Sequence, residues 1–289
     1  MDKLFSVIIV SYKNIDILRD CLDSIKKFND IGDSLEVIVS DNSEDEVLYH
    51  TIKQEYDWIK IIKNENRGFG AGNNRGYEIS SGKFLLFLNP DTILVEPIFQ
   101  FAASKFEKDS SLALFGVQLL DRDLKKNCSF YALDKYNVWA TLREKLCRKL
   151  GIFRKRKMFI AGADLFVRRS AFEQAGKFDE NIFMYLEEPD LQKRIRLHAD
   201  AKRVAFFNNK HIIHLEGGTE ERSFAQTLKQ HQRILETEKY YSQKWALGHK
   251  TVKERLQYQR FKKNIYKLLR RREKVSEQEQ LLELYKKYL

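Results

Sequence analysis

Apolar, β-branched runs alternate with helical patterns through the first half of the chain. The runs predict strands buried on both faces, over residues 5–10, 35–39, 58–62 and 84–88. Between them, apolar residues recur at helical spacing, which predicts helices over residues 15–25, 47–56 and 71–80. Strands that alternate with helices are typical of βαβ units. We therefore predict an α/β fold whose mainly parallel, Rossmann-like central sheet is flanked by helices.

The second half of the chain is less regular. It predicts strands over 112–120 and 158–167, the second broken by Gly162, and helices over 171–176, 186–198 and 224–245. Two further segments, 138–157 and 251–274, carry apolar stripes among many lysines and arginines, which predicts basic amphipathic helices. We divide the chain into a main domain, residues 1–245, and a basic helical C-terminal extension, residues 246–289.

Charge and cysteine content narrow the possible partners and location. The 289 residues carry a formal net charge of +11, which favours an anionic partner such as a nucleotide, a nucleic acid or an acidic membrane surface. The 3 cysteines lack zinc or redox spacing, as expected for free thiols in a reducing compartment. No run approaches the roughly 20 apolar residues of a membrane span, and the N-terminus does not resemble a signal peptide. We therefore expect a cytoplasmic protein.

Polar residues directly after the predicted strands are the first candidates for function, because ligands bind beyond the carboxyl ends of parallel strands. These groups are Ser11-Tyr12-Lys13, Asp41-Asn42-Ser43 and Asn89-Pro90-Asp91. Asp41 can accept hydrogen bonds from a base or ribose, although Asp-Asn-Ser is also common turn chemistry. Asp91 is placed to ligate Mg²⁺ or Mn²⁺ between two phosphates, although Asn-Pro-Asp also forms turns.

A glycine-rich segment, residues 66–76, leads into a predicted helix. Its four glycines allow the backbone to approach a pyrophosphate, and Arg67 or Arg75 can add charge-assisted hydrogen bonds. The dinucleotide fingerprint would follow the first strand, and the Walker string is absent from the sequence. The segment therefore indicates a phosphate or sugar rather than NAD or ATP, with a plain tight turn as the alternative.

Two later motifs carry further candidate chemistry. Glu187, Glu188 and Asp190 crowd together where a helix begins, so repulsion can raise one pKa toward that of a useful base. Alternatively, these acids only stabilise the N-terminus of the helix through its dipole. His214, in His-Leu-Glu-Gly-Gly-Thr219, is a candidate metal ligand, although a lone histidine is more often structural.

The order of these motifs resembles the inverting glycosyltransferase family 2, which has the GT-A fold. The closest likeness is to its rhamnosyltransferase-like branch, which builds bacterial surface polysaccharides. The resemblance covers about residues 4–220. It rests on Ser6–Tyr12, Val39–Ser43, Asn66–Gly76, Phe87–Asp91, Gly162–Arg169, Phe183–Leu191 and His214–Thr219.

The resemblance implies a transferase that moves a hexosyl or rhamnosyl group from a dTDP-, UDP- or GDP-sugar to a saccharide or lipid-linked acceptor. It implies Mn²⁺ or Mg²⁺ at Asp91 and His214, with Asn89 replacing the first Asp of the family's D-x-D motif. It places the catalytic base at Glu188, with Glu187 as the alternative. The implied donor-binding residues are Ser11, Tyr12, Asp41, Asn42, Arg67, Gly68, Gly72, Asn73 and Asn89.

Three other functions account for less of the sequence. A nucleic-acid-binding protein would explain the charge but not the acids at strand ends, so we expect no nucleic-acid partner. A nucleotidyltransferase of related fold would need a glycine-rich loop directly after the first strand. An inactive binding module is disfavoured by Asp41, Asp91 and Glu188. We expect residues 143–157 and 251–274 to contact the anionic inner face of the cell membrane, with a solvated basic face as the alternative.

Overall fold

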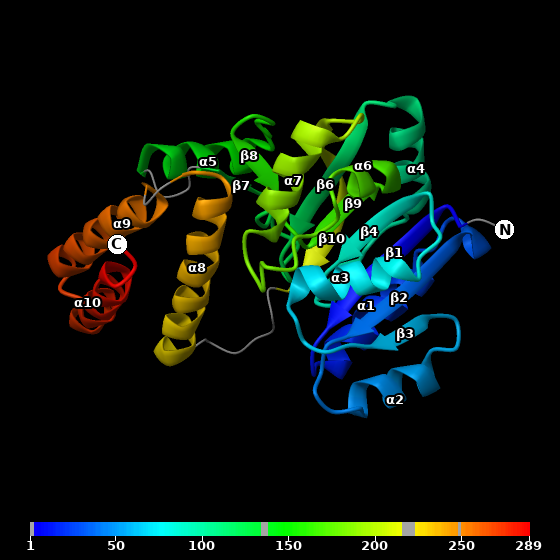
Figure 1. Ribbon diagram of the computed structural model, residues 1–289, viewed down its shortest axis with the longest axis horizontal. Coiled ribbons are helices and arrows are strands. Elements are labelled where there is room, and N and C mark those ends of the chain that lie inside the picture. The colour runs from blue at the N-terminus through cyan, green and yellow to red at the C-terminus, as the bar shows by residue number, and fades with distance from the viewer. Residues whose placement is uncertain (1–2, 134–137, 216–222, 248–249) are drawn as a thin grey trace.

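A curled, eight-stranded sheet forms the centre of the molecule (Figure 1). The computed structural model describes residues 3–133, 138–215, 223–247 and 250–289. The strand order is β3-β2-β1-β4-β9-β6-β10-β5, and a separate two-stranded sheet pairs β7 with β8. The strands are β1 (Phe5–Ser11), β2 (Leu35–Asp41), β3 (Lys60–Lys63), β4 (Phe84–Leu88), β5 (Thr92–Leu94), β6 (Leu112–Leu120), β7 (Phe130–Ala132), β8 (Met158–Ile160), β9 (Asp164–Arg168) and β10 (Arg203–His214).

The large sheet is mainly parallel, as predicted. Strands β3, β2, β1 and β4 pair in parallel, and β10 pairs in parallel with β6. Strand β9 runs antiparallel between β4 and β6, and β5 runs antiparallel to β10 at the edge. The carboxyl ends of the parallel strands therefore meet the amino end of β9 at one edge of the sheet.

Helices cover the sheet and extend the chain beyond it (Figure 1). Helix α3 packs on β1 and β2, and α4 packs on β6. The helices are α1 (Ile15–Lys27), α2 (Val47–Glu55), α3 (Phe69–Glu78), α4 (Phe99–Lys108), α5 (Val138–Leu150), α6 (Arg169–Gln174), α7 (Glu187–His198), α8 (Phe224–Lys244), α9 (Lys250–Leu268) and α10 (Arg272–Lys286). Within the part of the chain that the structure describes, no helix is long and apolar enough to cross a bilayer.

The central strands are buried along their whole length, which explains their continuous apolar runs. One face of the sheet packs aromatic rings together. The rings of Phe5 and Phe84 lie 5.4 Å apart, and those of Phe115 and Phe166 stack at 4.7 Å. Each such pair adds about 0.5–1.5 kcal/mol beyond the burial of its area. These contacts join β1 to β4 and β6 to β9, and the Phe5 and Phe166 rings, 6.3 Å apart, join the two pairs of strands.

A buried carboxylate ties the strands together at the edge opposite the carboxyl ends. Glu36, at the start of β2, accepts hydrogen bonds from the Ser6 hydroxyl at 2.6 Å and the Ser81 amide at 2.5 Å. Its second oxygen accepts from Lys60 Nζ at 2.8 Å. Burial alone would raise the pKa of Glu36, but these bonds outweigh burial and lower the pKa to about 2. Glu36 is therefore ionised and stabilising at neutral pH.

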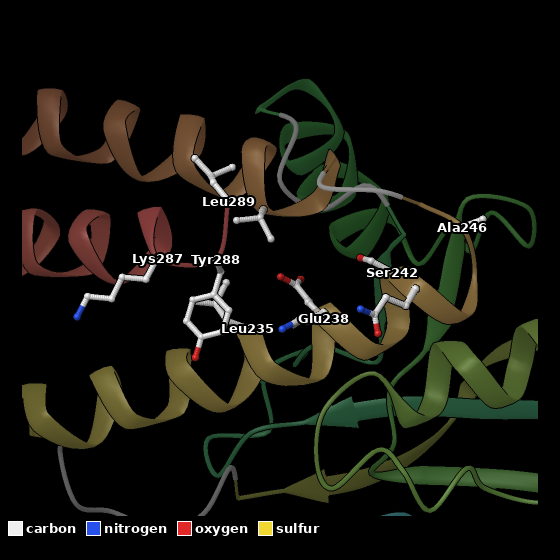
Figure 2. Close-up of a pocket in the computed structure, with 10 residues that line it drawn as sticks. Leu235, Glu238, Ser242, Ala246, Lys287, Tyr288 and Leu289 are labelled. Carbon is white, nitrogen blue, oxygen red and sulfur yellow. The ribbon is translucent and has the colours of Figure 1, made fainter.

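Helices α8, α9 and α10 form a helical unit beside the sheet (Figure 1). Its apolar core includes Leu235 of α8, Val252 and Leu256 of α9, and Tyr285 of α10. A cavity of about 580 Å³ lies between α8 and the end of the chain. Figure 2 shows Glu238, from α8, directed into this cavity. The cavity contains none of the residues predicted to act in catalysis.

The opposite side of α8 contacts the segment that precedes and begins α7. Thr237 Oγ1 donates to the Met184 carbonyl at 3.0 Å, and the Tyr240 hydroxyl donates to Asp179 at 2.7 Å. Lys244 Nζ lies 2.7 Å from the same Asp179 carboxylate. Helix α8 thus belongs to both packing units, and the boundary between residues 245 and 246 stays a prediction.

The two predicted basic helices are shorter than expected. The first ends at Leu150 because Gly151 adopts a φ of 67°, and the Ile152 amide closes the turn by donating to the Cys147 carbonyl at 2.8 Å. The run of basic residues at 154–157 therefore lies outside the helix. Residues 251–274 span two helices, because Arg270 adopts a φ of 55° and ends α9 in the same way.

Candidate active site

Asp41 lies at the carboxyl end of β2 and is completely buried. The Ser43 amide donates to one carboxylate oxygen at 2.8 Å, and Lys63 Nζ donates to the other at 3.1 Å. The neighbouring Asn42 amide donates to the Ser11 carbonyl at 2.9 Å, which joins this strand end to that of β1. Asp41 therefore closes the turn after β2 and also places a carboxylate at the strand end, so both of its predicted roles are compatible.

A small pocket of about 280 Å³ opens beside Asp41, and Lys63 belongs to its lining. Arg67 and Arg75 contribute further positive charge to this pocket. Arg67 also lies 3.4 Å from Glu180 in an ion pair, so its charge is partly offset. The Tyr12 hydroxyl donates to Glu44 at 2.8 Å, and the ring is exposed. This edge of the sheet therefore offers cations and an exposed ring to an anionic, aromatic ligand.

The glycine-rich turn is packed tightly between two other segments. Gly68 has a φ of 101°, and a Cβ atom there would lie 2.1 Å from the Phe183 carbonyl oxygen. Phe69 donates its amide to that same oxygen at 3.0 Å. A Cβ atom on Gly72 would lie 2.9 Å from Val10 and 3.0 Å from Asn42. Both glycines are required for this close packing, which holds the turn between β1, β2 and the segment before α7.

Two polar side-chain atoms of predicted donor-binding residues lack partners in the described part of the chain. They are Ser11 Oγ and Asn73 Oδ1, and both are buried. The Asn73 amide nitrogen does donate to the Phe69 carbonyl, at 3.0 Å. Buried polar atoms are almost always satisfied in native proteins, so solvent or a bound ligand would complete these two.

Asp91 and His214, predicted as metal ligands, are brought together from distant parts of the chain. His214 Nε2 lies 3.3 Å from Asp91 Oδ1, and the Leu215 amide donates to the Asp91 carbonyl at 2.9 Å. The pair forms because His214 lies opposite Thr92 where β10 pairs with β5. Asn89, the other residue of this motif, donates its amide to the Ala163 carbonyl at 3.0 Å.

The chemistry of this pair fits a divalent cation. A carboxylate oxygen and an imidazole nitrogen are suitable donors for Mn²⁺, and Mg²⁺ is commonly held by one or two carboxylates together with phosphate oxygens. No group of three or more His, Cys, Asp or Glu arranged for a metal occurs among the described residues. Residues 216–219, which complete the motif after His214, lie outside that part of the chain.

The two adjacent glutamates at the start of α7 have different environments. Glu187 is 5% exposed, and its Oε2 has no hydrogen-bond partner among the described residues. Burial, and then the charge of Glu188, raises the pKa of Glu187 well above its usual value. Glu188 is only partly buried, and its side chain lies against Gly162, where a Cβ atom would fall 2.3 Å from Oε1. Of the two glutamates, only Glu188 is therefore accessible.

The backbone before these glutamates is strained. Tyr185 and Leu186 both adopt left-handed conformations, with φ values of 70° and 68°. Asp190, the third acid of the motif, is instead fully buried and accepts from Arg194 Nε at 2.8 Å and Trp245 Nε1 at 2.9 Å. It anchors the end of α8 to α7 and has no access to a reacting group.

Asp164, a further acid at this edge, was not among the predicted site residues. Asp164 is fully buried on β9, opposite Leu88, and accepts the Val117 amide at 2.6 Å. Its Oδ1 has no hydrogen-bond partner within the described chain, and burial raises the pKa of its carboxyl group well above the usual range. The sequence did contain a signal for this residue, because Asp164 is an acid within an otherwise apolar predicted strand.

Comparisons of sequence give consistent matches. Residues 6–174 match the profile of glycosyl transferase family 2. The rhamnosyltransferase WbbL of Escherichia coli (strain K12) is 26% identical over 264 residues, which cover 84% of this chain and 95% of WbbL. The putative glycosyltransferase EpsH of Bacillus subtilis (strain 168) is 34% identical over 91 residues, covering 30% of this chain and 25% of EpsH.

Comparisons with solved structures confirm the predicted GT-A fold. The mannosyltransferase PcManGT from Pyrobaculum calidifontis, in complex with GDP-Man and Mn²⁺, matches with a TM-score of 0.57 at 15% identity. The match covers 81% of this chain and 63% of that one. TarS 1-349 of S. aureus, in complex with UDP, matches with a TM-score of 0.54 at 14% identity, over 81% of this chain and 65% of that one. The chain thus spans less than two thirds of either solved chain.

Proposed function

The chain belongs to glycosyl transferase family 2, and we propose that it transfers a sugar from a nucleoside-diphosphate sugar by a single, inverting displacement. The observation that carries this proposal is the convergence of acids from separate elements at one edge of the sheet. Asp41 ends β2, and Asp91 follows β4. The side chain of Glu188 contacts Gly162, which precedes β9 at the same edge. Such an arrangement suits a donor whose diphosphate is neutralised while its sugar is exposed to attack.

The donor would bind across the ends of β1 and β2. In this proposal Asp41 faces the ribose or base, and the pocket beside it, which Lys63 lines, receives part of the nucleotide. The unpartnered Ser11 Oγ and Asn73 Oδ1 are available to complete the contacts. The solved relatives that carry GDP-Man or UDP support a nucleotide-linked donor. The rhamnosyltransferase relative favours a rhamnosyl over a hexosyl group.

Asp91 and His214 would hold the divalent cation, Mn²⁺ or Mg²⁺. When bound, it supplies positive charge beside the diphosphate that departs. Their donor atoms, 3.3 Å apart, already face one another, so little rearrangement is needed for both to bind one cation.

Glu188 is the proposed catalytic base. It accepts the proton of the acceptor hydroxyl while that oxygen attacks the anomeric carbon, and the carbon–diphosphate bond breaks on the opposite side. Glu187 is unsuited to this role because its carboxyl group is buried, and burial raises its pKa, which favours the protonated form.

The acceptor in this proposal is a saccharide or lipid-linked saccharide of surface polysaccharide synthesis. We choose this acceptor because we expect the basic segments 143–157 and 251–274 to face an anionic membrane, where lipid-linked saccharides are found. The described part of these segments keeps half-exposed leucines among basic residues, as on Leu146 of α5 and Leu269 after α9. Apolar side chains surrounded by basic ones are typical of surfaces that contact a bilayer.

A donor screen by thermal unfolding tests the proposal. The dTDP-, UDP- and GDP-sugars are each added with and without Mn²⁺, and a ligand present at 100 times its Kd stabilises the folded state by about 2.7 kcal/mol. We expect one nucleotide class to raise the Tm by several degrees only when the metal is present. Asp91→Ala should remove the metal-dependent part of the rise and lower the transfer rate by roughly 10³-fold. A chain that no nucleotide sugar stabilises would contradict the proposal.

A further inference from the structure

A basic groove lies at the carboxyl end of α7, next to the starts of β6 and β10. Its volume is about 840 Å³, and Leu133, Leu197 and one acid, Asp200, also contribute to its walls. The groove is lined by the cationic residues Lys155, Arg156, Lys193, Arg196, Lys202 and Arg203. These cations come from the loop before β8, from α7 and from the residues that begin β10. Lys155 and Arg156 belong to the predicted basic segment 138–157, and the other four cations lie outside both predicted basic segments.

The charge of this groove is largely uncompensated within the described residues. Arg203 pairs with Asp109, and Asp200 accepts a hydrogen bond from the Gln174 side chain at 2.7 Å. Lys155, Arg156 and Lys202 form no ion pair in the described part of the chain. Positive side chains that converge on one hollow repel one another, so a bound anion would stabilise this arrangement.

One face of α7 connects the groove to the candidate base. Arg196 Nη2 donates to the Met158 carbonyl at 3.3 Å, and the Gln192 amide exchanges two hydrogen bonds of 2.9 Å with the backbone of Ile160. One turn earlier on the same face of α7, Glu188 lies against Gly162. Residues spaced four apart on α7 thus meet residues spaced two apart along β8 and the turn after it. Lys193, the first groove residue on α7, lies about 7.5 Å along the helix from the base.

An apolar ridge lies on α5, the helix that precedes the groove residues Lys155 and Arg156 in the chain. Helix α5 buries Glu144 and Cys147 toward β7 and leaves Leu146, Leu150 and the following Ile152 exposed. Strand β7 pairs with β8, and β8 packs against α7, so ridge and groove belong to one layered unit. A membrane surface offers phosphate charge and an apolar interior together, whereas a nucleic acid would not cover exposed leucines.

We propose that this groove binds phosphate groups carried by anionic membrane lipids, with the α5 ridge entering the interface beside it. The inference deepens the proposed function, since it rests on a transferase that works on lipid-linked acceptors at a membrane. The cations that would make the contact surround the carboxyl end of the helix that begins with the candidate base, and two of them, Lys193 and Arg196, lie on that helix.

Flotation with lipid vesicles tests this site. The full-length protein is mixed with vesicles of phosphatidylcholine alone or with added phosphatidylglycerol. We expect it to float only with the anionic vesicles. The double variant Arg156→Glu, Lys202→Glu should bind these at least about tenfold more weakly, because each basic residue near the surface contributes to attraction. Both side chains are exposed, so the fold should be kept.

The matched control reverses two exposed lysines elsewhere, Lys27→Glu on α1 and Lys53→Glu on α2, which changes the net charge equally. Full binding by the control and loss by the groove variant would support the site. Equal loss in both variants would show that only net charge matters and would overturn it. Binding of the groove to pyrophosphate or to RNA as tightly as to vesicles would overturn the assignment to lipid.

Transfer to a water-soluble acceptor separates this inference from the proposed function. We expect the groove variant to keep unchanged kcat and KM in that assay, since its residues lie away from the reacting groups. An active enzyme that ignores anionic vesicles would refute the lipid site alone. Vesicle binding that depends on the groove, in a protein without transfer activity, would refute the transferase alone.

Discussion

The two ends of the central sheet hold buried carboxyl groups in opposite ways. At the amino end, Glu36 is surrounded by donors from Ser6, Ser81 and Lys60, and these bonds lower its pKa to about 2. At the carboxyl end, Asp164 and Glu187 each keep one oxygen without a partner in the described chain, and burial raises their pKa values.

This difference separates residues that stabilise the fold from residues that prepare the site. A fully bonded, ionised carboxylate such as Glu36 favours the folded state at neutral pH. A buried and incompletely bonded acid disfavours it, and such groups concentrate at functional sites. The comparison therefore predicts that replacing Glu36 lowers stability, whereas replacing Glu187 raises it and replacing the neighbouring Glu188 lowers activity.

The largest expected effect is at Glu188. Glu188→Gln keeps the size of the side chain but cannot accept a proton, so we expect kcat to fall by roughly 10²–10⁴-fold. Donor-induced stabilisation should be unchanged. Steady-state kinetics and thermal unfolding with donor measure the two quantities. Full turnover by this variant would show that Glu188 is not the base, and Glu36→Gln serves as the control that leaves kcat unchanged.

The next effect is on stability, at Glu36. Its pKa falls from 4.5 to about 2 on folding, which corresponds to about 3 kcal/mol at pH 7, so Glu36→Gln should destabilise by up to this amount. Because the folded-state pKa is the lower one, this stability is present above pH 4.5 and is lost as the pH falls toward 2. Urea unfolding at pH 7 and pH 3 measures it. A gap between wild type and variant that widens in acid would contradict the assignment.

The smallest effect is expected at Glu187, and it has the opposite sign. Because folding raises its pKa, the wild type loses stability as the pH rises above the unfolded-state value. Glu187→Gln removes that loss and should raise the Tm by about 2–4 °C, a shift typical of 1 kcal/mol in a larger domain. Thermal unfolding at pH 5 and pH 8 should show the gain mainly at pH 8. A lower Tm at pH 8 would indicate that the carboxyl group is ionised and bonded.

The sequence predicted the first half of the fold well because its strands are buried on both faces. The apolar run of 84–88 has no polar interruption, and Asn14 caps α1 by accepting the Ile17 amide at 3.4 Å. Four elements had no counterpart among the predictions, namely β5, α4, β7 and β10. Strand β5 has three residues and β10 is only partly buried, so neither gives a clear periodic pattern.

Strand ends and motifs were enough to predict which residues lie at the site. They could not predict the burial and the contacts of each side chain. Asp91 and His214 meet because β10 pairs with β5, a contact between segments more than a hundred residues apart. The contrast between Glu187 and Glu188 depends on which side of α7 faces β8. Asp164 was missed because its burial is a property of the folded sheet.

Helix α8 stabilises a segment that comes before it in the chain. Thr237 holds the carbonyl of Met184, just before the strained pair that leads into α7, and Trp245 holds Asp190 within that helix. A fragment that ends before α8 would still contain every residue assigned here to the donor, the metal and the base. It would lack the contacts that support the segment carrying Glu188, so we expect the smallest active fragment to include α8.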